Sequence, residues 1–354
     1  MSMTAQTEVI KPPRTEVGLL GWLKKNLFST WYNALLTIFS IAFIYIVLRG
    51  IITWVVRDAR WEVITTNSKV FMIGRYPGKE AWRVLVSLGI VVLLAMLTWV
   101  FRRAEGKPRR WLVIGWLLSL PLITILLRGF SRESPFLPLV SENMWSGVLL
   151  TLVLAIVGIV ASFPLGVLLA LGRRSKLPAI KVLCTVYIET IRGVPLISVL
   201  FMSQLMLPLF LPPEIRLSTV MRALTGMTLF SAAYTAENVR GGLAAIPIGQ
   251  YEAARAVGLN EMLVMGLIVL PQALRAVIPA IVGQFISLFK DTTLVAIVGL
   301  TDLLGIAKAV TSQKEFIGLH KEVYAFAAVI FFIFCYTMSY ASRRLEQVLG
   351  VGER

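Results

Sequence analysis

Apolar runs long enough to cross a lipid bilayer recur along this chain of 354 residues. A membrane-spanning helix needs about 20 consecutive, mostly apolar residues. The sequence offers eight such runs, at 33–56, 82–101, 111–127, 145–172, 185–210, 219–237, 263–289 and 323–342. The segments between them are short, so few residues remain for a large domain outside the membrane. We therefore predict an all-α polytopic membrane protein.

The composition excludes the soluble classes of protein. Hydrophobic residues make up 57% of the chain and charged residues 15%, whereas soluble domains have about 45–50% and 25%. The net charge is +16, which in a soluble chain would suggest a nucleic-acid partner. In a polytopic protein the excess of Lys and Arg is instead typical of loops held in the cytoplasm. We therefore expect no nucleic-acid partner.

The distribution of positive charge predicts the orientation. The clusters RRAEGKPRR (102–110) and GRRSK (172–176) lie in short loops on the side that also holds both termini. Because such loops stay in the cytoplasm, we expect both termini there and an uncleaved first span. The loop at about 57–81 is then external, and it is long and polar enough to form a small cap or a partner contact.

The sequence lacks the residues that several kinds of chemistry require. Cys184 and Cys335 lie inside apolar runs and His320 is the one histidine, so a metal site built from His and Cys is not expected. The sequence has no GxxxxGK[ST] phosphate loop, so the chain should not hydrolyse ATP itself. No catalytic residues are predicted. If transport here is active, its energy enters through another protein or an ion gradient.

The loop between the sixth and seventh runs has a helical pattern. It reads GGLAAIPIGQYEAARAVGLNEMLVMGLIVLP, from Gly241 to Pro271. We expect a short amphipathic helix over about 249–257, ended by Gly258, with Pro271 marking the return to the membrane. Within the helix, alanines would give a thin surface that a groove of another protein could hold.

Three motif residues would make that surface. Glu252 would offer a charge to a basic partner beside Ala253 and Ala254. Together with the following Gly258, Ile268, Leu270 and Pro271, these residues match the EAA---G---------I-LP loop of ABC-importer permeases at every defined position. The chain therefore resembles that family, in which this loop is the coupling helix docked on the ATP-binding subunit. The alternative is an ordinary surface helix between two spans.

Flanking segments resemble the polar amino-acid branch of those permeases. They are YIETIRGVPLISVLF, YTAENVRGGLAAIP and LPQALRAVIPAIVGQFISLFKDTTLVAIVGL, and the resemblance covers about 140–345. It implies a type I importer core of five helices at 141–345, with the EAA loop at 239–271. A three-span extension at 33–140 would precede this core, and cytoplasmic segments at 1–32 and 346–354 would flank the whole.

The resemblance also implies partners. The three-span extension is similar to the longer of two unlike permeases in general amino-acid uptake systems. This implies a second, different permease, a dimer of ATP-binding subunits that carries the ATP and Mg, and a periplasmic amino-acid-binding protein. The chain itself would need no cofactor and would lie in a bacterial inner membrane.

Two charged residues stand within the fifth run, where charges are costly and often functional. Glu189 and Arg192 are three residues apart, so they share a helical face and can pair. Gly193 and Pro195 then interrupt the helix. The segment is either part of a substrate path or an internal ion pair that fixes a bend, and the sequence favours neither.

A second polar group closes the seventh run. Lys290, Asp291, Thr292 and Thr293 offer charges and hydroxyls that suit a zwitterionic amino acid. The alternative is a structural cap, with Asp291 or Thr292 at the start of a short helix over 293–304. Gln284, on the same run, either faces the pore or bonds to a neighbouring helix.

Small residues recur every four positions on the fourth run. Gly158, Ser162, Gly166 and Ala170 form a stripe that lets another helix approach closely, so we expect a packing role. Glu237 and Arg240, at the inner end of the sixth run, are expected to support the coupling loop.

The function predicted from the motif is the membrane-spanning half-pore of an ATP-driven amino-acid importer. The main alternative is an ion-gradient-driven secondary amino-acid transporter, in which Glu189 and Asp291 would serve as ion sites. Two further alternatives stay open: a membrane-embedded enzyme or assembly protein, and a permease whose pore leaves substrate selection to the binding protein.

Overall fold

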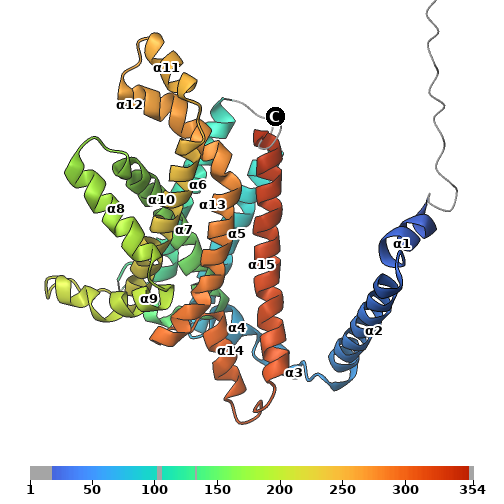
Figure 1. Cartoon of the computed structure of the whole chain (residues 1–354). Coiled ribbons are helices and arrows are strands. Elements are labelled where there is room, and N and C mark those ends of the chain that lie inside the picture. The colour runs from blue at the N-terminus through green and yellow to red at the C-terminus, as the bar shows by residue number, and fades with distance from the viewer. Residues whose placement is uncertain (1–17, 102–105, 132–133, 351–354) are drawn as a thin grey trace, which may run out of the picture. The chain divides into compact units, whose positions relative to one another are not determined.

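A computed structural model describes residues 18–101, 106–131 and 134–350 of the chain. Most of the predicted segment at 1–32 and the end of the tail at 346–354 lie outside these residues. The chain divides into two units, Met1–Trp61 and Glu62–Arg354. Figure 1 shows both units.

The first unit consists of α1 (Leu19–Leu27), α2 (Trp31–Thr53) and a π-helix, η1 (Trp54–Asp58). The side chain of Thr30 accepts a hydrogen bond from the backbone N–H of Asn33 and caps α2. None of the residues of α2 is buried. A helix that is apolar all round suits a lipid environment, as the first predicted span requires.

The second unit begins with helices that correspond to the predicted extension. They are α3 (Glu62–Thr66), α4 (Ser68–Ile73), η2 (Gly78–Glu80), α5 (Ala81–Val100), α6 (Lys107–Arg128) and η3 (Glu142–Met144). The core follows with α7 (Gly147–Arg173), α8 (Pro178–Arg192), α9 (Leu196–Leu205), η4 (Leu207–Phe210), α10 (Thr219–Ala244), α11 (Ile248–Ala256), α12 (Glu261–Leu263), η5 (Val264–Val269), α13 (Leu270–Asp291), η6 (Thr292–Val298), α14 (Leu303–Thr311) and α15 (His320–Leu349). The described residues contain no strand, only two isolated backbone bridges. This confirms the all-α class.

The structure does not confirm the count of eight spans. Within the described residues, six helices are long and apolar enough to cross a membrane, or seven if the bent pair α8 and α9 is one span. The two helices of that pair meet at 111°, across the break at Gly193–Pro195 that the sequence indicates. Pro195 has no N–H to continue the first helix and starts the second.

The helix α10 is long enough to span but is not among these six. It is buried along much of its length because it packs against α7, α9 and α13. A helix surrounded by protein can carry small and polar residues such as Ser231 and Thr235, which would be costly in lipid. Its place at the centre of the core explains its low hydropathy.

The predicted external loop forms a packed cap. Val63 on α3 and Phe71 on α4 are fully buried. The ring of Phe71 lies 5.0 Å from that of Phe326 on α15, and Gln313, which follows α14, donates a hydrogen bond to Asn67 at 3.3 Å. In Figure 1 these elements lie at the end of the unit opposite to α11. The cap therefore belongs to the core rather than to a free loop.

The segment after α13 differs from the predicted helix over 293–304. It is a 3-10 helix, η6, that ends at Gly299 with a φ of +85°, and α14 starts only after Asp302. Asp302 caps α14 by accepting hydrogen bonds from the backbone of Gly305 (2.9 Å) and Leu304 (3.2 Å). The predicted capping by Asp291 or Thr292 is wrong, because the Thr292 hydroxyl donates backwards to the Phe289 carbonyl at 2.7 Å.

Candidate functional site

The loop with the EAA pattern forms a helix, α11, at the end of the unit where α15 also ends (Figure 1). It covers Ile248–Ala256, one residue away from the predicted bounds at each end. Gly258 has a φ of +84°, a backbone conformation that favours glycine, and its N–H donates to the Arg255 carbonyl at 2.9 Å. The glycine therefore makes the turn between α11 and α12.

The three motif residues of α11 do not share one face. Glu252 and Ala253 are exposed, but Ala254 is only 5% exposed and packs in an internal cluster with Leu243 and Val264. Residues two apart on a helix point in nearly opposite directions, so Glu252 and Ala254 cannot both face a partner. The expectation that both alanines form an outer surface is wrong for Ala254, which instead holds the helix against its own chain.

Exposed apolar side chains accompany Glu252 on the outer side of this loop. Ile248 is 74% exposed, Val257 76% and Met262 86%. Ile248 lies one helical turn before Glu252, so these two share a face. We call Ile248, Glu252, Ala253, Val257 and Met262 the exposed set of the loop.

An ion pair fixes the turn beside Gly258. The Arg255 guanidinium binds both carboxylate oxygens of Glu261, with Nε–Oε1 at 2.8 Å and Nη2–Oε2 at 3.3 Å. The hydrogen bond between them raises the pKa of Arg255 and lowers the pKa of Glu261, so the pair stabilises the charged form of both side chains. Asn260 caps α12 by accepting from the Leu263 N–H at 3.0 Å. The shape of the turn is therefore set within this chain.

Two polar links attach α11 to the core. Arg174, next to the end of α7, donates to the Tyr251 hydroxyl at 3.2 Å and to the Leu243 carbonyl at 3.3 Å. Gln272 on α13 donates to the side chain of Gln250 at 3.1 Å. Hydrogen bonds therefore connect α11 to the residue that follows α7 and to α13.

The helix that follows the loop begins before Pro271. A continuous helical run starts at Glu261 and passes through η5 into α13, and Pro271 lies in the first turn of α13. The helix therefore starts ten residues before Pro271, and the prediction that Pro271 marks the return to the membrane stays a prediction. The π-helix η5 precedes the proline, and its shifted hydrogen bonds leave room for a residue without an N–H.

A charged cluster joins three helices near the same end of the core. Arg173 on α7 lies 2.8 Å from Glu189 on α8 and 3.4 Å from Glu237 on α10. Arg192 on α8 lies 4.0 Å from Glu189 and 3.6 Å from Glu237. Arg240 on α10 bonds to Glu237 with Nε–Oε1 at 2.9 Å. We call Arg173, Glu189, Arg192, Glu237 and Arg240 the charged cluster.

The cluster contains the predicted pair of Glu189 and Arg192, and also Arg173, which sequence reasoning missed. Arg173 stands 64 residues before Glu237, and no local pattern relates the two. The available signal was the length of α7, since a helix that starts at Gly147 and runs for 27 residues ends at Arg173.

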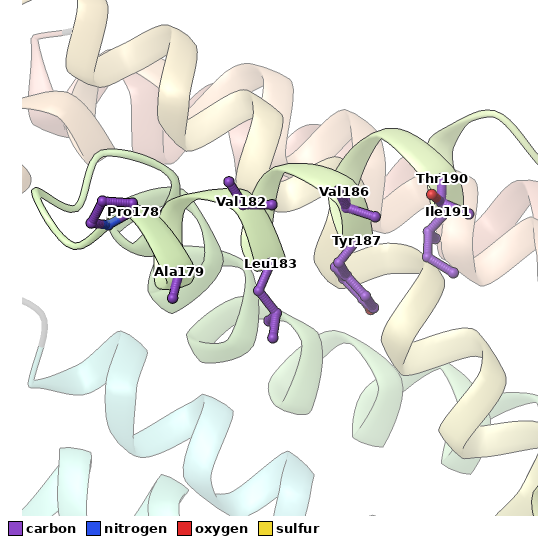
Figure 2. Close-up of a pocket in the computed structure, with 8 residues that line it drawn as sticks. All are labelled: Pro178, Ala179, Val182, Leu183, Val186, Tyr187, Thr190 and Ile191. Atoms are coloured by element: carbon purple, nitrogen blue, oxygen red, sulfur yellow. The ribbon is translucent and has the colours of Figure 1, made fainter.

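An apolar pocket of about 800 Å³ lies along α8. Figure 2 shows its lining side chains, which are Pro178, Ala179, Val182, Leu183, Val186, Tyr187, Thr190 and Ile191. Neither Glu189 nor Arg192 is among them. One side of α8 is thus apolar, and another carries Glu189 and Arg192 of the charged cluster. The pocket therefore has no charged group to hold a zwitterion.

The second group of predicted substrate-path residues lies at the end of α13. Thr292 is buried, whereas Lys290 is exposed, and the hydroxyl of Thr293 donates to the Lys290 carbonyl at 2.8 Å. Gln284 is half-buried on the same helix. In the described part of the chain, no ion pair joins Lys290 or Asp291 to the charged cluster, so the structure does not bring the two predicted groups together. Nor do the described residues contain a group of His, Cys, Asp or Glu that could hold a metal.

Comparisons with known proteins identify the family. Residues 162–349 match the model of the binding-protein-dependent transport system inner membrane component. The inner membrane amino-acid ABC transporter permease protein YhdY of Escherichia coli (strain K12) is 41% identical to this chain, over 94% of the chain and 93% of YhdY. The chain belongs to this family of transport permeases.

Two further proteins agree with this assignment. The glutamate/glutamine/aspartate/asparagine transport system permease protein BztC of Rhodobacter capsulatus is 35% identical to the permease described here, over 97% of both chains. A solved structure of an amino acid ABC transporter with histidines is 29% identical, with a TM-score of 0.50. The match covers 57% of the permease and 91% of the solved chain.

Family membership assigns the chain a place in a complex. As an inner-membrane permease component, it is not the subunit that hydrolyses ATP. The sequence predicts the same division from the missing phosphate loop.

The stripe of small residues lies inside the permease. Gly158, Ser162, Gly166 and Ala170 are all buried on α7. A Cβ at position 166 would lie 2.6 Å from the Cβ of Thr235 on α10, and one at 158 would touch Leu288 on α13 at 3.4 Å. The structure thus places the stripe between α7 and its two neighbours.

Proposed function

We propose that this permease forms one half of an alternating-access pathway that imports amino acids, and that α11 docks on an ATP-binding subunit. One observation carries the proposal. Glu252 is exposed on a helix that bonds to α7 and α13 of its own chain through Tyr251 and Gln250. Such a helix can receive a force from a partner and pass it to the helices of the core.

The coupling would follow from that attachment. ATP binding closes the dimer of ATP-binding subunits, and α11 moves with the subunit that holds it. Because Arg174 and Gln272 tie α11 to the ends of α7 and α13, these helices tilt between inward-open and outward-open arrangements. ATP and Mg belong to the partner subunit, and the permease needs no cofactor of its own.

The substrate is proposed to be an amino acid, because YhdY and BztC are both named for amino-acid transport. The four amino acids named for BztC are the first to test. We propose that the substrate path is lined by residues from two groups, namely Glu189, Arg192, Gln284, Lys290, Asp291, Thr292 and Thr293. Charged and hydroxyl side chains of both kinds suit the ammonium and carboxylate groups of such a substrate.

The proposed assembly contains a second, different permease and a periplasmic amino-acid-binding protein. The match to a binding-protein-dependent transport family supports the latter. Both termini would lie in the cytoplasm. This orientation is supported by the common position of α11 and the end of α15 at one end of the unit.

The decisive experiment is purification of the tagged permease from its own membranes in mild detergent, with mass spectrometry of the proteins that accompany it. Recovery of an ATP-binding subunit and a second permease is expected. Recovery of an ATP-binding subunit without another permease would indicate a homodimeric pore. Recovery of no ATP-binding subunit, together with uptake that stops when the ion gradient collapses, would overturn the proposal in favour of a secondary transporter.

Reversal of the charge of Glu252 tests the docking of α11. Glu252→Lys should lower amino-acid uptake about tenfold or more, because a carboxylate placed against a basic partner becomes a repelling ammonium. The amount of permease in the membrane should stay unchanged, since Glu252 is exposed. Uptake of labelled glutamate and glutamine, normalised to the amount of permease, measures the effect.

Glu315→Lys is the matched control. Glu315 is also an exposed carboxylate, but it follows α14 at the opposite end of the unit. It should leave the recovery of the ATP-binding subunit unchanged, while Glu252→Lys reduces it. Equal recovery with both variants would contradict the docking of α11.

A further inference from the structure

Two adjacent arginines at the end of α7 connect the coupling loop to the charged cluster. Arg174 donates to the hydroxyl of Tyr251 on α11 at 3.2 Å, and its guanidinium lies 5.9 Å from the centre of the Tyr251 ring. Arg173 lies 2.8 Å from Glu189 on α8 and 3.4 Å from Glu237 on α10. The residue that binds α11 and the residue that binds α8 are therefore neighbours in the chain.

The cluster leads on to the bend between α8 and α9. Arg192 is the last residue of α8 and lies 3.6 Å from Glu237 and 4.0 Å from Glu189. The break at Gly193–Pro195, where the two helices meet at 111°, follows directly. The guanidinium of Arg192 also lies 5.7 Å from the centre of the Tyr234 ring on α10. Arg173 and the last residue of α8, Arg192, therefore bind the same two carboxylates.

The charges of the cluster are unequal in number. The guanidiniums of Arg173, Arg192 and Arg240 share the carboxylates of Glu189 and Glu237. The excess of cations means that no arginine has a carboxylate to itself. A shift of Arg173 by a few ångströms would therefore change which arginine each carboxylate holds, without leaving a carboxylate unpaired.

We propose that Arg173 is a positioning residue for coupling, which transmits the displacement of α11 to the bent pair α8 and α9. This inference rests on the proposed docking of α11 and adds the path by which its movement reaches the break at Gly193–Pro195. When α11 moves, Arg174 carries the end of α7 with it. Arg173 then changes its ion pairs with Glu189 and Glu237. The end of α8 moves as a result, because Arg192 binds the same two carboxylates. The two pairings give the bent pair two discrete positions.

The test measures coupling rather than transport alone. The complete complex is reconstituted in lipid vesicles, and both the ATP hydrolysed and the amino acid accumulated are measured. Arg173→Gln should retain ATP hydrolysis within about twofold, while the amount of amino acid moved for each ATP falls about tenfold. Arg173→Lys, which keeps a charge at the position, should recover at least part of the loss.

Arg344→Gln is the matched control. Arg344 on α15 donates to the Tyr340 hydroxyl at 2.9 Å, as Arg174 does to Tyr251, but it is not connected to the cluster. The ratio of amino acid to ATP should stay unchanged in this variant. An equal fall with Arg344→Gln would show that loss of any such guanidinium disturbs the permease and would overturn the specific role of Arg173.

A double-mutant cycle tests the connection to α8. If Arg173 acts through Glu189, the variant with both Arg173→Gln and Glu189→Gln should be no worse coupled than the worse single variant. Losses that multiply would overturn the proposed path. If no ATP-binding subunit accompanies the wild-type permease, the proposed function itself fails. A normal ratio in Arg173→Gln, within an assembled complex, overturns this inference alone.

Discussion

Replacement of Gly258 by proline should abolish most transport while leaving the permease in the membrane. The φ of Gly258 is +84°, whereas proline fixes φ near −65°. Proline also removes the N–H that donates to the Arg255 carbonyl at 2.9 Å. The turn must then open, and the ion pair between Arg255 and Glu261 loses its geometry. A backbone residue forced into such a conformation costs about 1–3 kcal/mol, so the turn should change its shape rather than keep it. Because α11 would then no longer be presented correctly to its partner, we expect uptake to fall about tenfold or more.

The variant Gly258→Asn separates backbone conformation from contact. Asparagine tolerates positive φ better than other residues with side chains, and a Cβ at position 258 meets no atom of this chain within 4 Å. Uptake of labelled glutamine by Gly258→Asn should therefore stay close to that of the wild type. If asparagine is as damaging as proline, the position is needed for contact with the partner rather than for the turn. Normal uptake by Gly258→Pro would contradict the coupling role of the loop.

Leucine in place of Gly166 should destabilise the packing of α7 on α10. The Cβ at this position would lie 2.6 Å from the Cβ of Thr235, 2.7 Å from its Cγ2 and 2.9 Å from the Ala232 carbonyl oxygen. These are rigid parts of α10 rather than the tips of flexible side chains, so the two helices would have to separate. Overpacking of this kind costs about 1–3 kcal/mol, and the remaining atoms of leucine add to it.

The measurement is the amount of monodisperse permease recovered in detergent, and the temperature at which it aggregates. Gly166→Leu should lower both. Gly89→Leu on α5 is the control, because a Cβ at position 89 meets nothing within 4 Å and leucine there should change neither. A stable Gly166→Leu permease would show that α7 and α10 do not pack through this glycine.

Local patterns made α11 predictable. Pro247 precedes the helix and Gly258 follows it, and both act through the backbone of their own neighbourhood. The helix therefore lies within one residue of its predicted bounds. The direction of Ala254 was not predicted, since the motif shows which residues recur together and not which face packs on the core. The partner role of Glu252 stays a prediction.

The charged cluster shows what a sequence alone hides. The pairing of Glu189 with Arg192 follows from a spacing of three residues on one helix. The shorter contact, between Arg173 and Glu189, depends on how α8 crosses the end of α7. The case of α10 is different, because the sequence already includes 219–237 among the apolar runs, and only the burial of this helix depends on α7, α9 and α13 around it.

The packed cap has a consequence for any shortened form of this permease. Val63 on α3 and Phe71 on α4 belong to one apolar cluster with Leu303 and Val310 on α14, and Phe71 also meets Phe326 on α15. A chain that began after the cap would expose these apolar side chains together, and contiguous exposed patches of this kind favour aggregation. The core helices alone are therefore not a self-sufficient folding unit, and the residues before α7 are part of what keeps them soluble in detergent as single molecules.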